Sequence, residues 1–234
     1  MTVPIGTHSR ILASLNSSST ILAAYANPFD YAEWSVWKRH LRPGDLFVDV
    51  GANVGVYSLL AADLGASIVA VEPDPDNVRN LNANFNRNGY DAEVWSLALT
   101  NRPGDVHFTE GKDSENHLSD EAGLSRTVRG ERFDTLIDGR HVHGMKVDVE
   151  GAELSVLKGA ANALSEGEID LIQLEWNDRA RINFGESRES ARTLLWQYGY
   201  ALYRPERNGR LMPCDGSEGS DLFAARPATA AGLL

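Results

Sequence analysis

Three charged side chains alternate with valines along Lys146-Val147-Asp148-Val149-Glu150. Alternate side chains of an extended segment point to the same side, so Lys146, Asp148 and Glu150 are expected to lie together. Charges in a buried sheet are costly unless they are paired or functional. Asp148 is the candidate for a general base or a metal ligand, and Lys146 could tune its charge or contact a substrate. The alternative is a structural lysine–carboxylate cluster, with Glu153 on a solvated helix.

A second group of candidates lies in the turn Asp49-Val50-Gly51-Ala52-Asn53-Val54-Gly55. Glycines allow a tight turn and the close approach of a ligand to the backbone. A dinucleotide fingerprint needs glycines two and five positions after Gly51, where this chain has Asn53 and Val56. The Gly-Lys-Ser/Thr of a phosphate-binding loop is missing as well. The turn therefore favours a ligand without a pyrophosphate, and a dinucleotide is the weaker alternative.

Glu72 ends the next apolar run, 21 positions after Gly51 (72 − 51). A carboxylate at this position can accept hydrogen bonds from both hydroxyls of a ribose. Asp49 adds negative charge, which suits the sulfonium and amino groups of S-adenosylmethionine (SAM) better than phosphates. The alternative is that Asp49 only caps the following turn. Together, the turn and Glu72 favour SAM.

A metal ion is a further possibility, because Glu175 and Asn177 follow another apolar run, 169–174. With Asp148 they would form an all-oxygen set that suits Mg²⁺. The alternative is that Glu175 binds the substrate or a backbone amide. Among the histidines, His117 in the polar segment 110–130 is the better candidate for chemistry.

Other chemistry is not favoured by the sequence. His141 and His143 precede the strand expected at 145–149, at the end away from the expected site. The single cysteine, Cys214, allows no disulfide within the chain, and no base lies near it in the sequence.

Alternating strand and helix patterns surround these candidates and predict βαβ units with a mostly parallel sheet. Ligands of such sheets bind beyond the carboxyl ends of the strands. Residues 1–44 are expected to form an N-terminal arm and a helix that cap the substrate, and residues 45–234 the cofactor-binding domain. The polar segment 110–130 is expected to be a loop, either functional or a surface insertion. Strands are expected at 46–50, 67–71, 92–97, 145–149, 169–174, 200–204 and 221–225, and helices at 31–41, 54–64, 76–88, 153–164 and 187–198.

The bulk composition limits the partners. The 234 residues carry a formal net charge of −11, and such a surface repels the phosphates of nucleic acids. No apolar run approaches the ~20 residues that span a bilayer. We therefore expect a cytoplasmic protein that binds neither nucleic acid nor membrane.

The three motifs together resemble those of the FkbM-type methyltransferases. They are Val48-Asp49-Val50-Gly51-Ala52-Asn53-Val54-Gly55, Val71-Glu72-Pro73-Asp74-Pro75 and Lys146-Val147-Asp148-Val149-Glu150-Gly151-Ala152-Glu153. The resemblance implies an α/β, Rossmann-like class I methyltransferase fold: a three-layer sandwich around a mostly parallel seven-stranded sheet whose last strand is antiparallel. It also implies SAM as methyl donor and a hydroxyl of a specialised metabolite or sugar as acceptor.

The same resemblance assigns roles within the cofactor site. It places Asp49, Gly51, Asn53 and Gly55 around the methionine part of SAM. It places Glu72, with Pro73 next to it, at the ribose and Ala98 near the adenine. The expected activity is O-methylation of a small molecule that bears a hydroxyl group, with Asp148, Lys146 and Glu175 as catalytic candidates. The alternatives are an NAD(P)-dependent oxidoreductase and a non-catalytic nucleoside-binding domain.

Overall fold

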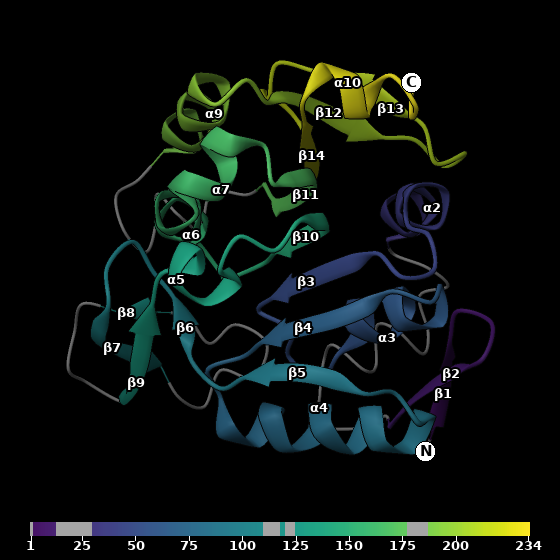
Figure 1. Ribbon diagram of the computed structural model, residues 1–234, viewed down its shortest axis with the longest axis vertical. Helices are drawn as coiled ribbons and strands as arrows, with labels where there is room; N and C mark the ends of the chain where they lie inside the picture. Colours follow the sequence, from purple (N-terminus) through teal and green to yellow (C-terminus); the bar gives the residue numbers. More distant parts are fainter. Residues whose placement is uncertain (1, 13–29, 110–117, 120–124, 177–186) are drawn as a thin grey trace.

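The computed structural model describes residues 2–12, 30–109, 118–119, 125–176 and 187–234 (Figure 1). The helices are α2 (Tyr31–His40), α3 (Val56–Asp63), α4 (Pro75–Asn88), α5 (Phe133–Ile137), α6 (Glu153–Gly159), α7 (Ala161–Glu166), α9 (Arg188–Gln197) and α10 (Pro227–Ala230). The strands are β1 (Thr2–Ile5), β2 (Ser9–Leu12), β3 (Leu46–Val50), β4 (Ser67–Val71), β5 (Ala92–Trp95), β6 (Ala98–Leu99), β7 (Gly104–Thr109), β8 (Leu118–Ser119), β9 (Ser125–Glu131), β10 (Val142–Val147), β11 (Ile169–Glu175), β12 (Ala201–Pro205), β13 (Leu211–Pro213) and β14 (Asp221–Ala225).

The central sheet has the strand order β13-β12-β14-β11-β10-β3-β4-β5. Strands β11, β10, β3, β4 and β5 are parallel, and β14 runs antiparallel between β11 and β12. This is the expected mostly parallel sheet with an antiparallel last strand. The sheet has eight strands and not the expected seven, because the short segment Leu211–Pro213 pairs with β12 at the edge.

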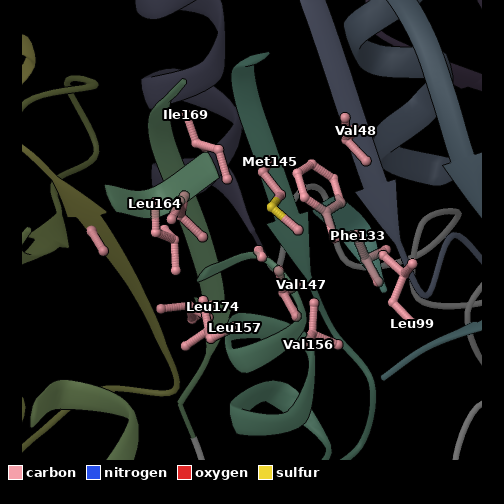
Figure 2. Packing of buried hydrophobic residues seen from close by; sticks show 14 of the residues in the cluster. Val48, Leu99, Phe133, Met145, Val147, Val156, Leu157, Leu164, Ile169 and Leu174 are labelled. Carbon is pink, nitrogen blue, oxygen red and sulfur yellow. The ribbon is translucent and has the colours of Figure 1, made fainter. Parts of the chain in front are cut away.

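Apolar residues of the central strands pack against helices on both faces of the sheet. Met145 and Val147 of β10 contact a cluster that includes Phe133 of α5 and Val156 of α6 (Figure 2). Phe47 of β3 belongs to the opposite cluster, with residues of α2, α3 and α4. Burial on both faces explains the nearly continuous apolar runs of these strands and produces the three layers.

The region 110–130 differs from the expected loop. Residues from Ser125 onward form β9, which pairs with β7 and β6 in a second sheet of order β6-β9-β7-β8. In its partner β7, apolar and polar residues alternate, which is typical of a strand that is buried on one face. Residues 110–117 and 120–124, which include His117, lie outside the described residues.

The helix expected over 153–164 is divided into α6 and α7. At the end of α6, a Cβ on Gly159 would lie 2.3 Å from the carbonyl oxygen of Thr100, so the helix approaches the neighbouring backbone closely. The pattern of apolar residues continues across this break, and a periodicity argument therefore does not reveal it.

The described part of the N-terminal region packs on the outer helices. The β1–β2 hairpin lies against α3 and α4, and α2 packs near β12. Asp30 precedes α2, but its carboxylate makes no capping hydrogen bond and instead accepts one from the Tyr57 hydroxyl at 2.9 Å. In the described part of the chain, no helix combines the length and apolar character needed to cross a bilayer.

Candidate active site

A cavity lies at the carboxyl ends of β3, β4 and β10. Six of the residues expected in the site line it: Gly51, Asn53, Glu72, Pro73, Ala98 and Asp148. Asp49, Gly55, Lys146 and Glu175 are not among the lining residues. Asn177 lies outside the described residues.

Gly51 brings the first turn against the tip of β10. Its φ is +81°, and a Cβ at this position would lie 1.9 Å from the carbonyl oxygen of Asp148. Only glycine combines this left-handed conformation with such a close approach. The cavity therefore depends on Gly51 for its shape.

Asn53 also has a left-handed backbone, with a φ of 51°. In this conformation its N–H donates to Glu72 Oε2 at 2.8 Å, and the Asp74 N–H donates to Glu72 Oε1 at 2.9 Å. Burial raises the pKa of Glu72 to about 7, against the opposing effect of these amide donors. Both oxygens of Glu72 are thus oriented at the cavity wall, where the Asn77 side chain is a further donor to the carboxylate.

Asp49 and Gly55 support the turn from behind. The Asp49 carboxylate is buried and accepts hydrogen bonds from the Ser58 N–H at 2.9 Å and the Ser58 hydroxyl at 2.6 Å. Burial raises the pKa of Asp49, and the charge of Lys146 opposes that rise. Gly55 precedes α3 with a φ of +94°, and a Cβ there would meet Leu81 at 2.6 Å. Asp49 and Gly55 therefore stabilise the start of helix α3 and do not line the cavity.

Lys146 and Asp148 form an ion pair at the end of β10, with 2.6 Å between Nζ and Oδ2. The Lys146 ammonium also lies over the Tyr57 ring, 4.7 Å from its centroid. Burial lowers the pKa of Lys146, but the carboxylates of Asp148 and Asp49 outweigh it and raise the pKa above its usual value. Lys146 therefore stays charged beside Asp148.

Carboxyl groups crowd the same edge. Asp148, Glu150 and Glu175 each offer a carboxylate oxygen within 4.8 Å of the others. Burial raises the pKa of Glu175 to about 9, with further contributions from Asp148 and Glu150. Oxygen donors at this spacing are of the type that Mg²⁺ takes.

His141, just before β10, and His143, the second residue of β10, lie at the opposite edge of the sheet. His141 contacts Asp170 at 3.0 Å, and His143 Nδ1 accepts a hydrogen bond from the Leu46 N–H at 3.0 Å. These contacts hold the amino ends of β3, β10 and β11 together. They give neither histidine a place at the cavity.

Several residues of this edge were not found from the sequence. Asn77 and Phe108 line the cavity, and Tyr57 and Gln173 lie next to Lys146; Glu150, which was expected beside Asp148, also lines the cavity. The alternation within 104–109 could have indicated Phe108, which reaches the cavity from β7. Asn77 stands two positions after the Glu72-Pro73-Asp74-Pro75 motif, so its place in the first turn of α4 could also have been predicted.

Residues 49–202 match the family model described as the methyltransferase FkbM domain. The chain belongs to this FkbM family. The cavity at the glycine turn and Glu72 is consistent with the SAM site of such an enzyme. The match to a methyltransferase domain favours the methyltransferase expected from the sequence over the oxidoreductase.

Among curated relatives, this chain is 31% identical over 137 residues to the hexuronic acid methyltransferase AglP of Haloferax volcanii, and the alignment covers 56% of each chain. It is 25% identical over 238 aligned positions to the AMB antimetabolite synthetase AmbE of Pseudomonas aeruginosa, covering 82% of this chain and 11% of that protein. The chain thus spans about half or less of the length of these relatives. The structure of the ribosomal protein L11 methylase from Lactobacillus delbrueckii subsp. bulgaricus shares the fold, with a TM-score of 0.51, 10% identity and 96% of both chains covered.

Proposed function

We propose that this methyltransferase acts on a hydroxyl group of a small molecule, with a sugar as the favoured acceptor. The observation that carries the proposal is the position of Asp148. This residue lines the cavity, and its Oδ2 lies 2.6 Å from Lys146 Nζ. An alcohol is a poor nucleophile until its proton is removed, so an ionised carboxylate at the methyl-transfer point is the group required.

The residues around the cavity fit SAM, which when bound supplies a methyl group on a positively charged sulfur. Glu72 would accept hydrogen bonds from the ribose hydroxyls at the wall of the cavity. The apolar side chains of Leu97, Ala98 and Phe108 would cover the adenine. Gly51, whose turn lies directly against the Asp148 carbonyl oxygen, would keep the backbone at this wall of the cavity in place.

In this proposal Asp148 accepts the proton of the acceptor hydroxyl. Lys146 fixes the orientation of Asp148 through the short Nζ–Oδ2 contact. Proton transfer to a positioned base contributes typically ~10²–10⁴-fold to a rate, and alignment of the reacting groups contributes more. Glu175, neutral at ordinary pH because its pKa lies near 9, could donate a hydrogen bond to the acceptor.

The acceptor class is supported by charge and by one relative. Asp148 and Glu150 line the cavity, and their carboxylates would repel the phosphates of a nucleic acid. The relative AglP is named as a methyltransferase of a hexuronic acid, and this similarity favours a sugar as the acceptor.

A Mg²⁺ ion at Asp148 and Glu175 is the second candidate for this cluster, with Glu150 as the third described oxygen donor. The ion would polarise the acceptor hydroxyl. We favour direct proton transfer, because Lys146 already neutralises Asp148 through the oxygen that faces it. EDTA should therefore leave turnover unchanged; loss of turnover with EDTA, restored by Mg²⁺, would establish the metal.

Replacing Asp148 by asparagine tests the proposed base. With labelled SAM and a panel of sugars and alcohols, Asp148→Asn should lose at least ~100-fold in kcat. Its dissociation constant for S-adenosylhomocysteine should change less than about threefold. The control is Glu150→Gln, which removes a neighbouring carboxylate from the same wall and should keep most of the activity. Turnover close to wild type in Asp148→Asn would remove Asp148 from the mechanism.

A further inference from the structure

Three polar side chains form a row across the middle of the central sheet, on the face that α2 and α3 cover. Lys146 of β10 is the register partner of Asp49 on β3 and of Gln173 on β11, and all three side chains are buried. Buried polar groups need defined partners, because an uncompensated one is costly. Asp49 holds the start of α3 and Lys146 pairs with Asp148, whereas Gln173 takes no part in the proposed proton transfer.

The side-chain amide of Gln173 makes three hydrogen bonds. Its Oε1 accepts from Trp37 Nε1 at 2.6 Å, and its Nε2 donates to the Tyr57 hydroxyl at 3.2 Å and to Asp221 Oδ1 at 3.0 Å. The Tyr57 hydroxyl accepts from Gln173 and donates its own proton to Asp30 Oδ2, at 2.9 Å. The Tyr57 ring is therefore fixed from two sides, by β11 and by the residue that precedes α2.

The fixed ring of Tyr57 lies under the Lys146 ammonium. The distance from Nζ to the ring centroid is 4.7 Å, and the Lys146 side chain is buried. An ammonium is attracted to the face of an aromatic ring, and the attraction is stronger where water does not compete. The ring thus holds the ammonium in place without taking up its N–H groups, which stay available to a carboxylate.

Three carboxylates act on the Lys146 ammonium. Burial lowers the pKa of the lysine, whereas the charges of Asp148, Asp49 and Asp221 raise it. Other donors already hold two of these acceptors: Asp49 accepts two hydrogen bonds from the first turn of α3, and Asp221 accepts one from Gln173. The hydrogen bond of Lys146 goes to Asp148, with 2.6 Å between Nζ and Oδ2. Because a lysine side chain has a flexible four-carbon stem, the surrounding residues must determine its direction among the three.

We infer that Tyr57 is a positioning residue whose ring directs the Lys146 ammonium to Asp148. The inference rests on the proposed function, in which the Asp148 carboxylate accepts the proton of the acceptor hydroxyl. Without the ring, Nζ can turn toward Asp49 or Asp221, and the Asp148 carboxylate then loses the contact that orients it. Tyr57 is not among the residues that line the cavity, so removal of the ring should lower kcat and leave cofactor binding intact.

A crystal structure of Tyr57→Met with S-adenosylhomocysteine tests the inference without any acceptor. Methionine fills much of the space of the ring but has no aromatic face. The distance from Lys146 Nζ to Asp148 Oδ2 should exceed ~3.5 Å, with the ammonium turned toward Asp49 or Asp221. Tyr57→Phe, which keeps the ring, is the control and should keep the contact. A contact at the wild-type distance in Tyr57→Met would overturn the inference, whichever acceptor the enzyme uses.

Activity shows whether this contact matters for methyl transfer. With labelled SAM and the panel of sugars and alcohols, Tyr57→Met should lose at least ~10-fold in kcat, and Tyr57→Phe should keep most of the activity. The dissociation constant for S-adenosylhomocysteine should change less than about threefold in both. In a Lys146→Met background, Tyr57→Met should cause no further loss, because the ring then has no ammonium to hold. Equal fold losses in the two backgrounds would mean that Tyr57 supports the fold alone, and would overturn the inference.

A trifluorophenylalanine at position 57 is the second variant, for the case that Tyr57→Met no longer binds S-adenosylhomocysteine. Fluorine withdraws negative charge from the face of the ring and changes its shape little, so the attraction on Lys146 weakens. Its kcat should lie at least ~3-fold below that of Tyr57→Phe, and an equal kcat would contradict the inference. Methylation of no acceptor in the panel would count against the proposed function, and the position of Lys146 Nζ in the crystal structures of the variants would still decide the inference.

Discussion

Gly51 shows most clearly how one residue shapes the site. The turn after β3 passes so close to β10 that a methyl group on Gly51 would overlap the carbonyl oxygen of Asp148. Gly44 has a similar left-handed φ of +92°, but nothing lies within 4 Å of the place a Cβ would take. A side chain at Gly44 would therefore cause backbone strain alone, whereas a side chain at Gly51 would cause both strain and a steric clash.

We predict that Gly51→Ala weakens S-adenosylhomocysteine binding at least ~10-fold and lowers the free energy of unfolding by more than ~2 kcal/mol, because both strain and overlap act on it. Gly44→Ala should lower the free energy of unfolding by only about 1 kcal/mol and leave binding unchanged. Calorimetric titration and denaturant unfolding measure the two effects. Equal losses in both variants would show that the contact with Asp148 is unimportant.

Site residues could be predicted where their position in a motif demands a particular backbone conformation or a charge. Gly51 and Glu72 were found from the turn and the strand that follows it, and both line the cavity. Asp49 was expected at the ligand, but its side chain faces Ser58 and lies behind the turn. Gln173 could not be recognised, because a glutamine within an apolar strand gives no indication of which distant side chains will surround it.

At the scale of elements, one carboxylate holds the N-terminal hairpin. Asp63, at the end of α3, accepts hydrogen bonds from the N–H groups of Thr7, His8 and Ser9 at 2.6 to 2.8 Å. Partial burial alone would raise the pKa of Asp63, but these donors together outweigh it and lower the pKa. The hairpin therefore depends on a contact far along the chain, at the end of α3 away from the cavity.

We predict that Asp63→Ala loosens the β1–β2 hairpin and lowers the free energy of unfolding by ~1–3 kcal/mol, because three amide donors lose their acceptor. Asp63→Asn keeps one acceptor oxygen and should lose less. Hydrogen exchange of the hairpin amides should rise in Asp63→Ala, while affinity for S-adenosylhomocysteine stays at the wild-type value. Loss of cofactor affinity would mean that the hairpin contributes to the site.

The central strands were predictable because burial on both faces makes them short apolar runs separated by helices. The smaller sheet was not, since β9 lies in a polar segment and gains its partners from β7 and β6. The edge strand β13 was missed for the same reason. Its pairing with β12 arises from tertiary contacts that three residues of sequence do not reveal.

At the scale of the molecule, buried carboxyl groups couple stability to pH. Glu175 has a pKa raised to about 9 by burial and by nearby carboxylates. A raised pKa means that the stabilisation is complete below the unfolded value, near 4.5, and is lost as pH rises through about 9. Glu72 and Glu153, both with pKa raised to about 7, add to this loss at lower pH.

We predict that the Tm of the protein without cofactor falls between about pH 5 and about pH 9, and that Glu175→Gln makes this decline shallower. The exposed Glu166→Gln should keep the wild-type profile. Thermal unfolding across the pH range gives the comparison. A profile for Glu175→Gln that overlays the wild type would show that Glu175 is ionised at neutral pH in the folded protein.

Calorimetric titration of the wild type and Glu72→Ala with S-adenosylhomocysteine, and of the wild type with NADH, measures the cofactor assignment directly. The carboxylate that Asn53 and Asp74 orient toward the cavity should make the wild type bind S-adenosylhomocysteine with one site, and Glu72→Ala should bind it at least ~10-fold more weakly. NADH should produce no saturable heat. Equal affinity for S-adenosylhomocysteine in the two proteins, or binding of NADH in its place, would contradict a SAM site built on Gly51 and Glu72.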